Sequence, residues 1–318
     1  EAGLSVVGIE GRLVGGECPY WGCVPSKMMI RAANLLAEGR RIPGMAGASS
    51  VTPDWAPVAQ RIRAEATDSW DDRVAVERLE RKGGRFVRGW ATITGPRSVQ
   101  VGGNEYTAGR ALVLGTGTEP AAPPIEGLAG TPYWTNREAI EVETLPRSLA
   151  ILGGGTIGLE LAQVFARFGV EVTVIEALDR LLAMEEPEAG ELLLSVLAED
   201  GIAVRVGAKA TKIGYDPAGG FTVVLDGGEQ VGAEQLLIAT GRRTALDRLG
   251  VEALQVPDLG PDAKSIPIAE AITERYQDLD ELDDLGEIDL HISGCINSCG
   301  HHHSGHIGIL GVDKDGQE

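Results

Sequence analysis

Two cysteines five positions apart, Cys18 and Cys23, are the first residues in this sequence whose types and spacing could do chemistry. They lie between a glycine pair and a Pro-Ser-Lys turn that opens a predicted helical run from Met28 to Arg40. The spacing lets both sulfur atoms meet across one turn, so a disulfide could open and close with little backbone movement. A thiol near the start of a helix is also biased toward the nucleophilic thiolate. The pair predicts a redox centre; a stapling disulfide or two buried thiols are the alternatives.

A second group is the glycine pattern formed by Gly153, Gly155 and Gly158. It follows an apolar stretch typical of a buried strand, opens a predicted helix that runs to about Phe168, and precedes a second apolar stretch that ends in Glu176. This is the context of a dinucleotide-binding turn. The first glycine would make the tight turn, the second would admit the pyrophosphate, and the third would let helix and strand pack closely. Glycines that serve packing alone are the alternative.

An acid at the end of the second strand of such a unit binds the ribose of the cofactor. Glu176 has this position, and because a carboxylate repels a 2′-phosphate, it favours NAD(H) over NADP(H). Arg180 lies close by in the sequence, and its positive charge would favour the 2′-phosphate of NADP(H). Glu10 ends a short apolar strand predicted over residues 4–10, and it is the corresponding acid for the adenosine ribose of another dinucleotide.

The segment from Gly15 to Lys27 resembles the active-site segment of the class I flavin- and pyridine-nucleotide-dependent disulfide oxidoreductases. That family includes dihydrolipoamide dehydrogenase, glutathione reductase and mercuric reductase. Every fixed position of its pattern, Gly-Gly-x-Cys-x4-Cys-x-Pro-Ser-Lys, is present. The resemblance implies an FAD cofactor, with Cys18 as the thiol that meets the substrate and Cys23 as the thiol next to the flavin. It also implies that Lys27 lies near the reactive edge of the flavin.

Further motifs extend this resemblance from residue 1 to about residue 256. Residues 111–117 are predicted to form a buried strand and look like the family's Ala-Thr-Gly crossing beside the flavin, and residues 236–242 repeat it. An acid early in the helix after the glycine turn matches the family's acid near the nicotinamide. The further cofactor-binding residues that the resemblance implies are Gly15, Gly16, Thr116, Gly117, Glu160 and Gly241.

The sequence therefore predicts an α/β fold with two Rossmann-like nucleotide-binding domains and a small α+β C-terminal segment. The FAD domain would take residues 1–119, with its first strand and glycine turn expected before residue 1. The NAD domain would be inserted over 120–242, with a partial return to the FAD domain over 243–258. Residues 259–318 would form the separate segment.

Other elements follow from apolar periodicity and turn residues. The sequence predicts helices over 55–67, 70–82 and 187–199, an antiparallel meander over 85–107, and strands over 202–206, 208–215, 221–226 and 234–239.

The segment from Ser293 to Asp313 resembles the sirohaem and 4Fe–4S region of sulfite and nitrite reductases. There a Cys-x3-Cys pair, matched here by Cys295 and Cys299, supplies two ligands of the cluster. Such a cluster needs four thiolates, and residues 250–260, where the other two are expected, contain no cysteine. Zn²⁺ bound by the cysteines and the four nearby histidines, or a loop without metal, are the alternatives.

Composition narrows the class of protein. The net charge of −19 without a basic cluster argues against nucleic acid as a partner. No apolar run approaches the roughly 20 residues of a membrane span. Four cysteines in two close pairs favour the cytoplasm over a disulfide-stapled secreted protein. The family resemblance implies a homodimer, although the dimerisation domain is not found in this sequence.

We therefore expect an enzyme in which electrons pass from NADH through FAD to the Cys18–Cys23 disulfide. Its substrate would be a small-molecule disulfide or a metal ion. The truncated FAD domain would impair it. The alternatives are a fragment of a sulfite or nitrite reductase haemoprotein, and a non-catalytic nucleotide-binding remnant or artificial join near residues 257–262.

Overall fold

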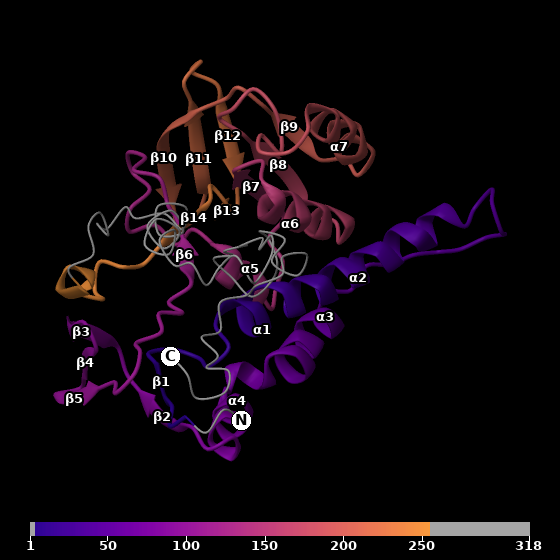
Figure 1. The fold of residues 1–318 in the computed structure, drawn as a ribbon. Helices are drawn as coiled ribbons and strands as arrows, with labels where there is room; N and C mark the ends of the chain where they lie inside the picture. The colour runs from indigo at the N-terminus through magenta and orange to yellow at the C-terminus, as the bar shows by residue number, and fades with distance from the viewer. Residues whose placement is uncertain (1–3, 255–318) are drawn as a thin grey trace, which may run out of the picture. The chain divides into compact units, whose positions relative to one another are not determined.

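The computed structural model describes residues 4–254, and within them the chain forms two compact units (Figure 1). The first unit contains the described residues up to Cys18, Trp70–Glu119, and the described residues from Thr244 onward. The second contains Pro19–Ser69 and Pro120–Arg243. The segment predicted as an inserted domain, 120–242, thus falls within the second unit, which also takes in residues 19–69.

The first unit begins with β1 (Val7–Glu10), which pairs in parallel with β2 (Arg85–Arg88). Helix α4 (Arg73–Arg81) packs on β2. A parallel pair needs a crossover connection, usually helical, and α4 belongs to it. The strand predicted over residues 4–10 is confirmed in its second half. The meander predicted over 85–107 is wrong for β2, which pairs with β1.

The remaining strands of this unit form an antiparallel sheet in the order β3 (Ala91–Gly95), β4 (Ser98–Val101) and β5 (Asn104–Thr107). A 3₁₀ turn, Val251–Leu254, packs on β3. A small apolar core joins the segment after Thr244 to this sheet. Its buried members are Ile93, Val99, Leu246, Leu249 and Val251.

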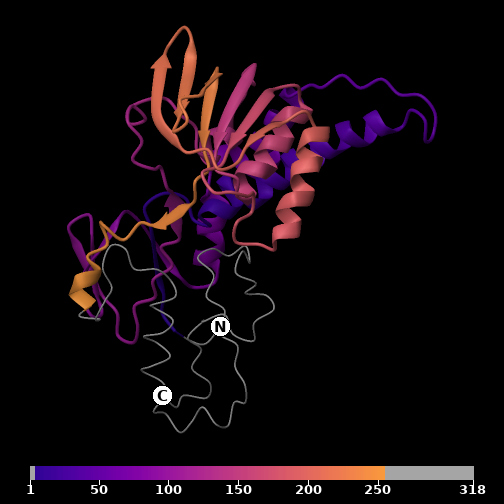
Figure 2. The same ribbon diagram turned by 90° about the horizontal axis from the view of Figure 1, so that it is seen from above.

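The second unit is built on a parallel sheet in the order β13 (Gln235–Ile238), β7 (Ser148–Leu152), β8 (Glu171–Ile175) and β9 (Ala203–Arg205). The inner strand β7 is a run of apolar residues, four of them buried, as a strand covered on both faces requires. Figure 2 shows this sheet between an antiparallel sheet on one side and helices on the other.

The antiparallel sheet consists of β10 (Ala210–Asp216), β11 (Gly220–Leu225) and β12 (Gln230–Ala233). Alternate residues of β11 are buried against the parallel sheet. The sequence analysis predicted β10 and β11 but not β12, nor the short strands β6 (Thr118–Pro120) and β14 (Arg242–Thr244). The buried core between the two sheets includes Leu152, Ile175, Ile213, Phe221, Val223, Leu225, Leu236 and Ile238.

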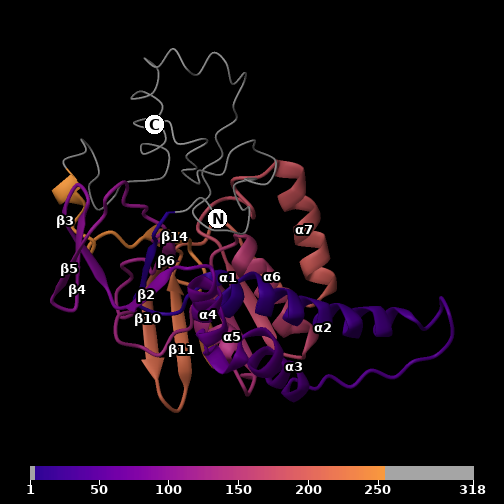
Figure 3. The same cartoon turned by 60° about the horizontal axis from the view of Figure 1, so that its bottom comes forward.

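On the other face lie α6 (Thr156–Arg167) and α7 (Pro187–Glu199), the latter with the predicted bounds. Helix α2 (Cys23–Arg41) packs along α6. Figure 3 shows the far end of α2 and the exposed loop after it projecting from the remainder of this unit. None of the helices in the described part of the chain is long and apolar enough to cross a membrane.

Shorter elements complete the fold. The predicted helix 55–67 is α3 (Ala56–Arg61), continued by a π-helical turn (Ile62–Ala66). The predicted helix 70–82 is α4, preceded by a 3₁₀ turn, Asp68–Trp70. A capping box of Thr135 and Glu138 begins α5 (Asn136–Glu141). Two short strands, β6 (Thr118–Pro120) and β14 (Arg242–Thr244), pair where the chain passes from one unit to the other.

One expectation is wrong: residues 111–117 form no strand in the described structure. Val113 is 81% exposed and Leu114 is 43% exposed, although the apolar pattern predicted a buried strand. A strand needs a neighbour to supply backbone hydrogen bonds, and none of the described strands pairs with this segment. An apolar run alone therefore did not decide its structure.

Candidate active site

The two cysteines lie on either side of a one-residue break between helices. Cys18 belongs to the short helix α1 (Glu17–Trp21), and Cys23 is the first residue of α2. The predicted helical run thus begins five residues earlier than expected and contains the Pro-Ser-Lys segment. Both side chains are partly exposed, and no disulfide joins them in this structure. Cys23 thus lies at the N-terminus of a 19-residue helix.

Gly15 and Gly16 form the turn that leads into α1. Their φ angles are 113° and 65°, a region that residues with a Cβ rarely adopt. The Gly16 amide donates to the Leu13 carbonyl at 3.0 Å and closes the turn. The glycine pair is therefore needed for the backbone path that brings the chain to Cys18.

The loop before this turn is held by Asp72, a buried acid that the sequence analysis did not single out. One carboxylate oxygen accepts from the Val14 amide at 2.6 Å, and Arg88 donates to both oxygens at 2.7 and 2.5 Å. Arg88 also donates to the Arg12 carbonyl. Burial raises the pKa of Asp72, but the hydrogen bonds from Arg88 and Val14 outweigh it and hold the pKa below the ordinary value.

Lys27 and Glu160 form an ion pair that joins α2 to α6. The Lys27 ammonium lies 2.7 Å from each carboxylate oxygen of Glu160. Lys27 is one turn beyond Cys23, and Glu160 lies in the second turn of the helix that follows the glycine-rich turn. The structure thus pairs two residues that the sequence analysis named separately. Both side chains are well exposed, so the pair adds little to stability.

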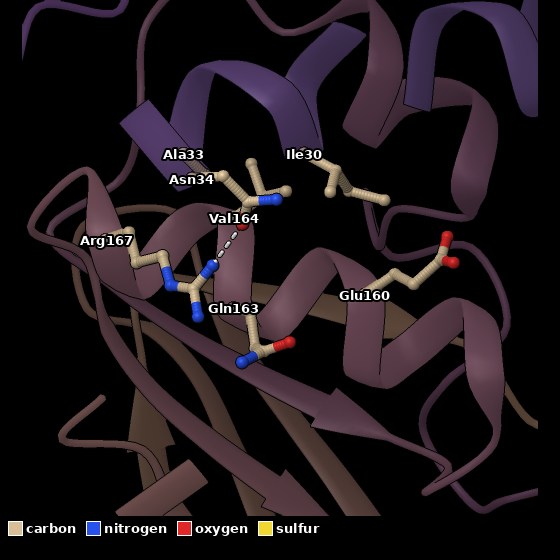
Figure 4. A pocket seen from close by; sticks show the side chains of 7 residues that line it. All are labelled: Ile30, Ala33, Asn34, Glu160, Gln163, Val164 and Arg167. Carbon is tan, nitrogen blue, oxygen red and sulfur yellow. Dashed lines mark hydrogen bonds between the residues drawn. The ribbon is translucent and has the colours of Figure 1, made fainter. Parts of the chain in front are cut away.

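Next to Glu160, α2 and α6 line an open cavity of about 270 Å³. Figure 4 shows the Glu160 carboxylate toward one end of the cavity and the Arg167 guanidinium toward the other. Arg167 donates to the Asn34 side chain at 2.6 Å and binds Asp200. The lining residues are Ile30, Ala33 and Asn34 from α2, and Glu160, Gln163, Val164 and Arg167 from α6.

The three glycines of the turn after β7 differ in how closely other atoms approach them. A Cβ on Gly153, whose φ is 113°, would lie 2.3 Å from the Ala239 carbonyl oxygen, and one on Gly158 would lie 2.4 Å from the Gly153 carbonyl oxygen. A Cβ on Gly155 would meet nothing within 4 Å. Close packing thus requires glycine at the first and third positions, while the backbone at Gly155 is open for a ligand to approach.

Glu176 follows β8 and lies against this turn. Its carboxylate accepts from the Gly154 amide at 2.5 Å and from the Leu178 amide at 2.8 Å. Arg180, the nearby cation, points its guanidinium elsewhere, because it donates to three backbone carbonyls of the following loop, those of Leu182, Ala183 and Glu185.

The other predicted cofactor residues lie at strand ends and crossings. Glu10 ends β1 and accepts from the Arg12 amide at 2.7 Å. Thr116 and Gly117 lie in the exposed irregular segment before β6. Gly241, with a φ of 120°, precedes β14, and a Cβ on it would meet nothing within 4 Å.

The predicted metal ligands Cys295 and Cys299 lie outside the described residues. Within residues 4–254, no group of three or more His, Cys, Asp or Glu residues is arranged to hold a metal ion. The cluster and sirohaem expectation for the tail therefore stays a prediction.

The curated proteins that this chain resembles include two kinds of enzyme. The chain is 36% identical over 268 residues to the mercuric reductase of Acidithiobacillus ferrooxidans, a match that covers 80% of this chain and 47% of that protein. It is 33% identical over 268 residues to the dihydrolipoyl dehydrogenase of Thermus scotoductus, covering 79% and 55%. The chain thus spans about half the length of the curated relatives it matches.

Solved structures agree on the fold. The HOCl-induced flavoprotein disulfide reductase RclA of Escherichia coli in complex with Cu(II) superposes with a TM-score of 0.68 at 23% identity, covering 82% of this chain and 56% of that one. LpdA of Mycobacterium tuberculosis gives 0.69 at 25% identity, covering 80% and 56%. The predicted α/β fold class is confirmed. The family model described as pyridine nucleotide-disulphide oxidoreductase matches residues 1–259, and this chain therefore belongs to that family.

Proposed function

We propose that this chain binds FAD and NADH and carries reducing equivalents to the Cys18–Cys23 pair. The observation that carries the proposal is the ion pair between Lys27, one turn beyond the second cysteine, and Glu160, next to the glycine-rich turn. It ties α2, the helix that begins at Cys23, to α6, the helix that would bind the nucleotide.

The residues present fit both dinucleotides. In the second unit, the open backbone at Gly155 would receive a pyrophosphate, and the Glu176 carboxylate would accept hydrogen bonds from ribose hydroxyls. In the first unit, the partly exposed Glu10 carboxylate at the end of the parallel strand β1 suits the ribose of FAD.

NADH is the favoured reductant. The Glu176 carboxylate would repel a 2′-phosphate, and Arg180, the cation that could neutralise it, has its guanidinium committed to three backbone carbonyls. This removes the main argument from the sequence for NADP(H).

The chain's own groups supply the thiol chemistry. FAD, when bound, would take a hydride from the nicotinamide and pass an electron pair to the disulfide. The N-terminus of α2 would stabilise the Cys23 thiolate that this releases. Cys18, on the preceding helix, would then attack a substrate disulfide, forming a mixed disulfide and releasing one substrate thiolate, or bind a soft metal ion. Glu160 would hold the Lys27 ammonium in place beside these groups.

The test is reconstitution of the full chain with FAD, followed by titration with NADH. We expect a yellow protein that NADH reduces and a long-wavelength absorption band that Cys23→Ser abolishes and Cys18→Ser retains. Failure to bind FAD would overturn the proposal, and NADH binding without FAD binding would favour the non-catalytic remnant. Turnover with lipoamide, glutathione disulfide and Hg(II) would then identify the acceptor.

A further inference from the structure

Trp90 is a large aromatic side chain that is 55% exposed, and it lies beside the acid that would bind the ribose of FAD. It lies two residues after the end of β2 and directly before β3, and the preceding Gly89 amide donates to the Glu10 carbonyl at 3.0 Å. This bond aligns the end of β2 with the end of β1. The indole is thereby held next to the Glu10 position within the first unit.

The backbone of Gly11 supports the indole ring. A Cβ on Gly11 would lie 2.5 Å from the Cδ2 atom of Trp90, so the ring can lie there only because residue 11 is glycine. The Arg12 guanidinium carbon lies 5.5 Å from the ring centroid, within the range of a cation–π contact. Arg12 is itself tied to Glu119 by an ion pair of 3.2 Å.

These contacts fix the indole while more than half of its surface stays open to solvent. Exposed tryptophans scattered singly on a surface need no explanation. This one differs because its nearest backbone is the loop directly after a candidate ribose-binding carboxylate. A base joined to a ribose held at Glu10 would lie within a few ångströms of the ribose ring, and aromatic side chains are good stacking surfaces for any base.

We propose that the exposed indole of Trp90 is the stacking surface for the adenine ring of FAD. The inference rests on the proposed function, since FAD binding by this unit is itself proposed. It assigns Trp90 to dinucleotide affinity, a role apart from electron transfer.

The test compares the wild-type chain with Trp90→Leu and Trp90→Phe by equilibrium titration of FAD and by calorimetric titration of ADP. The ADP titration contains saturating NAD⁺, which occupies the site in the other unit. We expect Trp90→Leu to weaken both FAD and ADP binding by about tenfold. Trp90→Phe, which keeps an aromatic face, should weaken them by roughly threefold or less.

Two controls separate stacking from folding. Melting of the ligand-free variants checks the fold, and the affinity for NAD⁺ should not change because Glu176 belongs to the other unit. Equal FAD affinity in wild type and Trp90→Leu would overturn the inference and leave the proposed function standing. A loss of FAD affinity with unchanged ADP affinity would also overturn it. Absence of FAD binding by the wild type would overturn both.

Discussion

At the scale of single residues, side-chain contacts join helices that lie far apart in the sequence. The Lys27–Glu160 pair is the clearest case, because its members are 133 residues apart in the sequence and yet join at 2.7 Å. Both side chains are exposed, and exposed ion pairs contribute about 1 kcal/mol or less to stability. Loss of this pair should therefore change the reaction rate far more than the stability of the fold.

We expect Glu160→Gln to leave the melting temperature nearly unchanged and to slow flavin reduction by NADH between about ten- and a hundredfold, because the Lys27 ammonium loses its position. Stopped-flow absorbance measures this rate. The matched control is Glu38→Gln, which breaks the exposed Arg31–Glu38 ion pair on α2, the helix that also carries Lys27. Equal rates in the two variants would show that the Lys27 partner is not needed.

We also expect a single residue, Glu176, to set the choice between NADH and NADPH. We expect Glu176→Gln to narrow the preference for NADH over NADPH by roughly tenfold, because the repulsion of the 2′-phosphate is removed. Arg180→Ala should leave the preference unchanged, since that guanidinium binds backbone carbonyls. Affinities of both variants for both nucleotides measure the effect. A change of preference in Arg180→Ala would contradict this account.

Among the elements, the glycine-rich turn between β7 and α6 yields a matched pair of variants. Gly155 has a φ of −86° and open space around it, so Gly155→Ala should fold like the wild type but lose at least about tenfold in NADH affinity. Gly158→Ala would press against the Gly153 carbonyl and should cost about 1–3 kcal/mol of unfolding free energy. Thermal melts and NADH titrations distinguish the two, and reversal of these effects would refute the assigned roles.

The loop before the cysteines depends on a second contact between elements, that of Asp72 with Arg88 and Val14. Because the pKa of Asp72 is lowered in the folded state, its stabilisation is present above the ordinary aspartate value near 4 and is lost as the pH falls through the lowered folded value. We expect Asp72→Asn to cost about 1–3 kcal/mol at pH 7 and to flatten the fall in stability below about pH 4. Denaturant melts across this range provide the measurement. A pH profile parallel to that of the wild type would rule this out.

On the scale of the whole molecule, each of the two compact units has its own apolar core. We therefore expect NAD⁺ to slow hydrogen exchange in the segment 148–167 and to leave the sheet of β3, β4 and β5 unchanged. Bound ligand stabilises only the structure that it contacts, by about 2.7 kcal/mol at a hundred times the dissociation constant. Exchange is measured by mass spectrometry, and protection of the sheet of β3, β4 and β5 would show that the nucleotide also acts on the first unit.

Much of the fold could be predicted because its signals are local. The bounds of α7, the helix after the glycine-rich turn and the parallel strands around it follow from apolar periodicity and from glycines that must adopt positive φ. The prediction failed at 111–117, where the same kind of apolar run forms no strand among the described residues. Periodicity reports what a segment could bury, whereas a strand also needs a hydrogen-bonded neighbour.

The sequence by itself determined the family, the α/β class and the residues that could do chemistry, because short motifs encode turn geometry and thiol spacing directly. Only the tertiary structure decided which of these residues act together. It paired Lys27 with Glu160, turned Arg180 away to backbone carbonyls and placed Trp90 on Gly11. Most of these contacts join residues far apart in the chain, and each depends on packing and side-chain direction, which no local pattern records.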